Sequence, residues 1–201
     1  DDFESSGFKD FLKKHQISLE ATKKISGTNT SCTYLIENPN MDHLTLYYPG
    51  SMDKKHYQPY QLDWFKKSKI GLITVASMVD NQAFLKMCEA AGIPVYFGMK
   101  LDKDAFPEAF VNSIAEKVNG IFANQVEYDY LLKATHSRDY LDIFNSNKAL
   151  EFIVVTKGVK GSTIFYREGL NIQHVEMPIL ETKHFVSAVG GGDAFMAGFL
   201  Y

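Results

Sequence analysis

The chain has 201 residues, of which 45% are hydrophobic, 13% aromatic and 22% charged, and its formal net charge is −3 at pH 7. This composition excludes a disordered chain, and the slight acidic excess without a dense lysine or arginine block argues against a nucleic-acid partner. Because no apolar run approaches the roughly 18 residues of a membrane helix, we expect no membrane partner. Two cysteines, Cys32 and Cys88, are too few for a disulfide framework, so we expect a reduced, cytoplasmic setting.

The first part of the chain predicts one helix and a pair of strands. Phe8, Phe11 and Leu12 share one face of a helix that would run over residues 3–15. Residues 30–36 and 43–48 are rich in β-branched and apolar side chains, which predicts two strands joined by a turn at residues 37–40. We therefore expect a small antiparallel β lobe around residues 30–48.

From residue 70 onward, apolar strands alternate with amphipathic helices. We predict strands over residues 70–75, 93–97, 120–123 and 152–156, and helices over residues 81–91, over 107–118 and from 126. Two further strands follow over residues 162–166 and 172–177, and a last helix begins at Gly192. Uniformly apolar strands that alternate with helices are typical of a mainly parallel sheet with helices on both faces, so we predict an α/β fold.

Three consecutive glycines, Gly190 to Gly192, precede the last predicted helix. Their backbone can turn sharply and approach a ligand closely, and the free amides at the start of a helix attract an anion. Asp193 follows directly, and a carboxylate beside an anion site can deprotonate an attacking hydroxyl group. The alternatives are a flexible turn before a helix and a dinucleotide-binding loop, whose G-x-G-x-x-G pattern fails here because Phe195 occupies its last position.

Two shorter motifs each follow a predicted strand. Residues 156–161, T-K-G-V-K-G, offer a hydroxyl group and glycine amides to a phosphate, or form an ordinary β-turn. Asn124 and Glu127 lie on one helical face, where they can hold the same metal-bound water or phosphate, or form a helix cap. Since ligands of open α/β sheets bind at the carboxyl ends of the strands, the three motifs together indicate one site.

The order and separations of these motifs resemble those of the PfkB-type, ribokinase-like sugar and nucleoside kinases. In that family an N-x-x-E motif, a T-x-G-x-x-G-like segment and a G-A-G-D-x-F-x-x-G motif follow one another. The matching residues here are Asn124, Glu127, Thr156, Gly158, Gly161, Gly190 to Asp193, Phe195 and Gly198. The resemblance spans most of the chain, and Asp1 and Asp2 lie near the position of the family's early acidic turn.

The resemblance implies an ATP-dependent kinase that phosphorylates a hydroxyl group of a sugar or nucleoside. Asp193 would be the general base, and the amides of Gly190, Gly191 and Gly192 would stabilise the charge of the transferring phosphoryl group. Glu127, with Asn124, would hold Mg²⁺ through waters and position the ATP phosphates. Three further residues would line the nucleotide site, namely Thr156, Gly158 and Gly161.

Ser187-Ala188-Val189 stands where the family usually has Asp-Thr-x, whose aspartate helps to bind a monovalent cation. The resemblance therefore does not carry monovalent-cation activation over to this chain. The same departure favours an alternative, a catalytically impaired module of the same fold that binds a nucleotide or sugar for regulation.

The resemblance also implies how the chain is organised. Residues 1–27 and 49–201 would form the nucleotide-binding core, truncated at both ends, with the family's opening strands before Asp1 and a C-terminal segment after Tyr201. Residues 28–48 would form a β lid over the substrate, and this lid is a candidate surface for a homodimer. Closing such a lid would exclude water and limit ATP hydrolysis.

Overall fold

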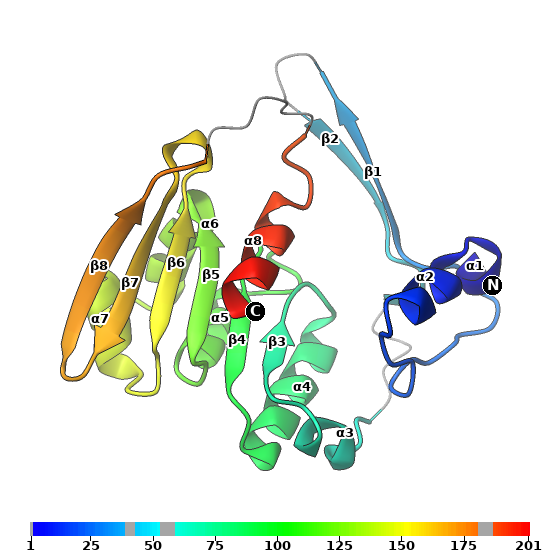
Figure 1. Ribbon diagram of the computed structural model, residues 1–201, viewed down its shortest axis with the longest axis horizontal. Helices are drawn as coiled ribbons and strands as arrows, with labels where there is room; N and C mark the ends of the chain where they lie inside the picture. The colour runs from blue at the N-terminus through cyan, green and yellow to red at the C-terminus, as the bar shows by residue number, and fades with distance from the viewer. Residues whose placement is uncertain (1, 39–42, 53–58, 181–186) are drawn as a thin grey trace. The chain divides into compact units, whose positions relative to one another are not determined.

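A computed structural model describes residues 2–38, 43–52, 59–180 and 187–201, and the chain divides into two compact units, one ending at Trp64 and the other beginning at Phe65 (Figure 1). Asp1, and Pro39 and Asn40 of the predicted turn, lie outside the described residues. The expected division of function, with a core over 1–27 and 49–201 and a lid over 28–48, stays a prediction.

The first unit begins with two short helices and continues into a β ribbon. The ribbon pairs β1 (Cys32–Glu37) antiparallel with β2 (His43–Tyr48), with Cys32 opposite Tyr48, which confirms the predicted pair. The single helix predicted over 3–15 is wrong, because the backbone of Gly7 is left-handed (φ 77°) and separates α1 (Asp2–Ser5) from α2 (Phe8–Lys14). A short helix, η1 (Gly50–Met52), follows the ribbon, and α3 (Leu62–Lys66) crosses the boundary between the units.

The base of the ribbon is tied to neighbouring segments of the first unit. One carboxylate oxygen of Asp2, in α1, accepts hydrogen bonds from the backbone N–H of Thr30 (2.8 Å) and from its hydroxyl group (2.9 Å). On the other side, the N–H of Ser51 donates to the carbonyl of Asn29 (3.0 Å). These bonds fix the chain directly before β1 and after β2.

The second unit is built on a six-stranded sheet in which sequence order equals spatial order. The strands are β3 (Gly71–Ile73), β4 (Val95–Gly98), β5 (Gly120–Asn124), β6 (Phe152–Thr156), β7 (Ser162–Glu168) and β8 (Asn171–Met177). The first four run parallel, and β7 and β8 are antiparallel to their neighbours. The mainly parallel sheet predicted from the apolar strands is confirmed.

Helices cover both faces of this sheet, as predicted (Figure 1). One face carries α4 (Met78–Ala91), α5 (Glu108–Ala115), α6 (Gln125–Ala134) and α7 (Tyr140–Ser146). The opposite face carries α8 (Gly191–Leu200), and the short helix η3 (Gly158–Lys160) lies between β6 and β7. The sequence did not predict α3 and α7.

The apolar core explains why the strands are uniformly apolar. Phe97, Ile121 and Ile153 are neighbours across β4, β5 and β6, and all three are 0% exposed. Phe97 packs on Phe106, with 5.1 Å between ring centroids, and Phe106 stacks on Phe110 of α5 at 6.4 Å. Strands buried on both faces need apolar side chains at consecutive positions. Among the described helices, none is long and apolar enough to cross a membrane.

Candidate functional site

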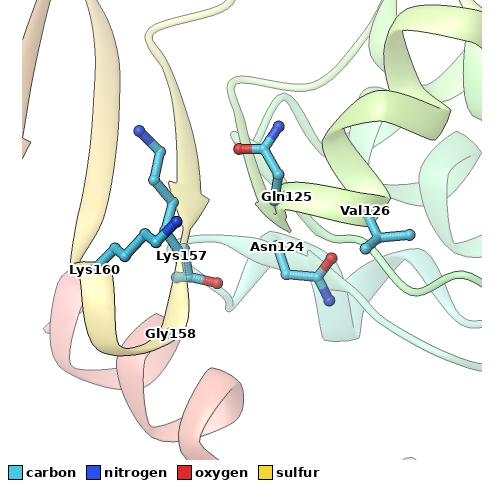
Figure 2. A pocket seen from close by; sticks show the side chains of 7 residues that line it. Asn124, Gln125, Val126, Lys157, Gly158 and Lys160 are labelled. Atoms are coloured by element: carbon cyan, nitrogen blue, oxygen red, sulfur yellow. The ribbon is translucent and has the colours of Figure 1, made fainter.

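A pocket of about 570 Å³ lies where the parallel strands end (Figure 2). Asn124 is the last residue of β5 and Thr156 the last of β6, and the two are opposite each other in the sheet register. The pocket is lined by Asn124, Gln125, Val126, Thr156, Lys157, Gly158 and Lys160. Its volume falls within the roughly 300–1,000 Å³ of small-molecule sites.

Asn124 and Glu127 form a reciprocal cap at the start of α6. The side-chain oxygen of Asn124 accepts from the N–H of Glu127 (2.9 Å), and a carboxylate oxygen of Glu127 accepts from the N–H of Asn124 (2.8 Å). Glu127 is 6% exposed and lies behind the pocket rather than in its lining. The cap holds the turn between β5 and α6 in one conformation and so fixes Asn124 at the rim.

The loop after β6 is closed by its own backbone. The N–H of Lys157 donates to the carbonyl of Gly161 (2.8 Å), and the N–H of Gly161 donates to the carbonyl of Gly158 (3.0 Å). Gly161 has φ 83° and ψ −138°, and a Cβ there would collide with the carbonyl oxygen of Met177. Gly161 therefore allows the close approach of the loop to the end of β8, while Gly158 and Thr156 line the pocket.

Two lysines in this loop escaped the sequence analysis, which weighed only its threonine and glycines. Lys157 and Lys160 both line the pocket, and their spacing within T-K-G-V-K-G is the signal that could have found them. The Lys157 ammonium lies 3.3 Å from both carboxylate oxygens of Glu176. A hydrogen bond from the hydroxyl of Thr163 (2.7 Å), with the pairing to Lys157, lowers the pKa of Glu176 and keeps it ionised.

Helix α8 crosses the sheet antiparallel to the strands, as two contacts demonstrate. Near its carboxyl end, Phe199 packs on Phe152, the first residue of β6, with 4.9 Å between ring centroids. One turn earlier, Met196 lies against Gly98, the last residue of β4, where an added Cβ would be 2.6 Å from its sulfur. The amino end of α8 therefore points to the edge where the parallel strands end, the edge that carries the pocket.

The glycine run forms an open amino end of this helix. Gly190 is the N-cap with φ 75°, and a Cβ at any of the three glycines would meet no atom within 4 Å. Among the described residues, no backbone carbonyl accepts from the N–H of Gly192 or Asp193. The carboxylate of Asp193 is exposed, and within the same residues it has no hydrogen-bond or ion-pair partner. The arrangement offers free donors beside a free carboxylate.

The predicted site residues thus fall into three groups. Asn124, Thr156 and Gly158 line one pocket. Glu127 and Gly161 support the rim of that pocket without lining it. The glycine run and Asp193 lie at the same edge of the sheet but outside the pocket lining. Among the described residues, no three carboxylate, histidine or cysteine side chains gather in a way that could hold a metal ion.

Comparison with known proteins gives a family and a set of similar folds. Residues 1–201 match the model of the pfkB family of carbohydrate kinases. The nucleoside kinase of Methanocaldococcus jannaschii, an archaeal member of the ribokinase family, is similar with a TM-score of 0.84 at 22% identity, over 99% of this chain and 62% of that one. No curated protein matches the sequence.

Two further solved structures have similar folds. The nucleoside kinase of Burkholderia thailandensis in complex with inosine has a TM-score of 0.82 at 19% identity, over 98% of this chain and 63% of that one. The ribokinase of Arabidopsis thaliana complexed with ribose and ATP has a TM-score of 0.72 at 16% identity, over 92% and 59%. The chain thus spans less than two thirds of the length of these proteins, and the likeness confirms the predicted ribokinase-like fold.

Proposed function

The chain belongs to the pfkB family of carbohydrate kinases, and we propose that it transfers the γ-phosphate of ATP to a hydroxyl group of a sugar or nucleoside. The observation that carries the proposal is the open amino end of α8, with Asp193, at the edge of the sheet that holds the pocket. Inosine, ribose and ATP in the complexes of the similar kinases support the same classes of acceptor and donor.

In this proposal Asp193 is the general base. Its carboxylate is exposed and lacks a partner within the described residues, so it can accept the proton of an acceptor hydroxyl group as that oxygen attacks phosphorus. The role expected for the Gly191 amide is not supported, because its N–H donates to the carbonyl of Ala188 (3.0 Å). The N–H groups of Gly192 and Asp193, which donate to no backbone carbonyl among the described residues, would stabilise the negative charge of the phosphoryl group. Phosphoryl transfer depends mainly on positioning and charge stabilisation, which rigid backbone donors supply well.

The pocket would hold the phosphates of the donor. Thr156 and Gly158 line this space, and Gly161 keeps the loop in place. Bound Mg²⁺ would neutralise phosphate charge. Asn124, at the rim, and Glu127, behind it, would hold the ion through waters, since Mg²⁺ usually keeps several of its own waters in protein sites.

No monovalent-cation site is part of the proposal. The hydroxyl oxygen of Ser187, which stands where the family has an aspartate, accepts a hydrogen bond from the N–H of Val189 (3.2 Å). Ala188 and Val189 offer no side-chain oxygen that could replace the missing carboxylate.

The β ribbon of the first unit is the proposed lid. Its apolar side chains are exposed, among them Tyr34 (65%), Ile36 (57%) and Leu44 (59%), and an isolated two-stranded ribbon is at best marginally stable in water. Closure over the acceptor, or pairing with a second copy, would cover this surface. Sedimentation of the whole protein with and without acceptor would distinguish the two uses.

The test is ATP-dependent phosphorylation by the full-length protein over a panel of sugars and nucleosides. Asp193→Asn should lower kcat by about 10²–10⁴-fold, the usual contribution of a general base, while ATP affinity stays within about twofold. Asp10→Asn is the matched control, because Asp10 is an exposed aspartate on α2 that the proposal does not use. It should leave kcat unchanged.

Each outcome decides between functions. Equal activity of the wild type and Asp193→Asn would refute the base role. ATP binding by the wild type without turnover of any acceptor would favour the regulatory module, which the sequence of residues 187–189 also suggests. Turnover with loss on Asp193→Asn would establish the kinase.

A further inference from the structure

The pocket at the ends of β5 and β6 carries positive charge. Its lining includes two lysines, Lys157 and Lys160, and no aspartate or glutamate. Figure 2 shows the two lysine side chains on one side of the pocket and those of Asn124 and Gln125 on the other. Such a lining suits an anionic ligand.

The two lysines differ in their electrostatic partners. The charge of Lys157 is compensated by Glu176, at 3.3 Å from both oxygens. Lys160 is exposed, and within the part of the chain that the structure describes its ammonium has no carboxylate within ion-pair distance. Lys160 therefore provides the uncompensated positive charge at this pocket.

The backbone that carries Lys160 is held firmly. Its N–H donates to the carbonyl of Lys157 (3.1 Å), and its neighbour Gly161 is fixed between the Gly158 carbonyl and the end of β8. The α-carbon of Lys160 thus stays at the rim while its flexible side chain is free to follow a ligand. A lysine in this position acts as a movable point charge rather than as a planar fork.

We propose that Lys160 binds the phosphate chain of the nucleoside triphosphate and makes the pocket prefer charged nucleotides to the uncharged nucleoside. The inference rests on the proposed function, since it takes the pocket as the donor site. An ammonium–phosphate contact is a charge-assisted hydrogen bond. Because the Lys160 side chain is exposed, salt would partly screen the attraction between the two charges. We expect it to contribute about tenfold to ATP affinity.

The test compares the full-length protein with three variants by calorimetric titration of ATP, ADP and adenosine in the presence of Mg²⁺. Lys160→Gln should weaken ATP binding about tenfold, ADP binding less, and adenosine binding not at all, because only the phosphates meet the ammonium. Lys160→Arg should restore most of the ATP affinity. Raising the salt concentration should reduce the difference between Lys160→Gln and the wild type.

Lys148→Gln is the matched control. Lys148 is an exposed lysine that precedes β6, at the opposite edge of the sheet from the pocket, and its ammonium contacts only the side chain of Asn145 among the described residues (3.4 Å). The Lys148→Gln variant loses the same charge as Lys160→Gln, so an effect of net charge alone would appear in both variants.

In kinase assays Lys160→Gln should raise the KM for ATP about tenfold and leave kcat and the acceptor KM within about twofold.

The outcomes separate this inference from the proposed function. If ATP binds Lys160→Gln within twofold of the wild type, or if ATP and adenosine lose affinity equally, the inference is overturned and the kinase proposal stands. If the wild type binds no ATP, the kinase proposal fails and the inference fails with it.

Discussion

Asn147 should be one of the most sensitive positions of the second unit, although it does not line the pocket. It follows α7, is 3% exposed, and satisfies three backbone groups at once. Its amide group donates to the carbonyls of Ala115 (2.9 Å) and Val118 (2.8 Å), and its side-chain oxygen accepts from the N–H of Ala149 (2.9 Å). It thereby links the end of α7 to the end of α5.

The magnitude follows from what Asn147→Ala leaves behind. Ala115 and Val118 are 2% and 0% exposed, so their carbonyls would lose partners in a site with little access to water. Each buried polar group left unpaired costs about 1–3 kcal/mol, and an entering water could recover part of this. We expect Asn147→Ala to lower the free energy of unfolding by about 2–4 kcal/mol, measured by urea denaturation followed by circular dichroism.

Asn145→Ala provides the comparison. Asn145 lies two residues earlier and is exposed, and among the described residues its side chain accepts only from Lys148, at 3.4 Å. Because alanine is the better helix former, this variant should be neutral or slightly stabilising, by up to about 0.6 kcal/mol. If the free energies of unfolding of the two variants agree within about 0.5 kcal/mol, the three hydrogen bonds do not act as argued.

Two further outcomes can be measured with single substitutions. Gly161→Ala should destabilise the protein by about 2–4 kcal/mol, because it adds strain at φ 83° and a collision with the Met177 carbonyl, whereas Gly169→Ala should cost only about 1 kcal/mol, since Gly169 has a positive φ in open space. Equal costs in urea denaturation would refute the role of the collision. Burial raises the pKa of the Cys88 thiol to about 11, so about one molecule in a thousand carries the thiolate at pH 8. A disulfide reagent should therefore modify Cys88 only on unfolding, and rapid labelling of Cys88 in the native Cys32→Ser variant would contradict this.

The elements that the sequence predicted well are those in which one physical signal dominates. β6 was predicted residue for residue because Phe152–Thr156 has no polar side chain before its last position and is buried between two layers of helices. α7 was missed because its seven residues are too few for a clear period, and its start depends on Asp139, whose carboxylate accepts from the N–H of Leu141 (2.9 Å). Local caps of this kind carry little signal in a single sequence.

In the candidate site, too, the sequence predicted the features that depend on one physical signal. Asn124 and Thr156 could be placed at one edge because parallel strands end together. That Lys157 has a carboxylate partner could not be predicted. Lys157 meets Glu176 only because the strand register sets Thr163 of β7 opposite Glu176 of β8. The register of two antiparallel strands decides which residues face each other, and composition alone does not determine that register.

The pocket is formed by two neighbouring strands, β5 and β6, joined by α6 and α7, so every residue that lines it belongs to one continuous stretch of chain. Closing this stretch costs less loop entropy than pairing it with more distant parts of the chain, so it can form before they join. Helix α8 packs on β4 and β6 only after the rest of the sheet has been synthesised. On the ribosome, the pocket would therefore be assembled before Asp193 emerges, and the two halves of the site would be joined last.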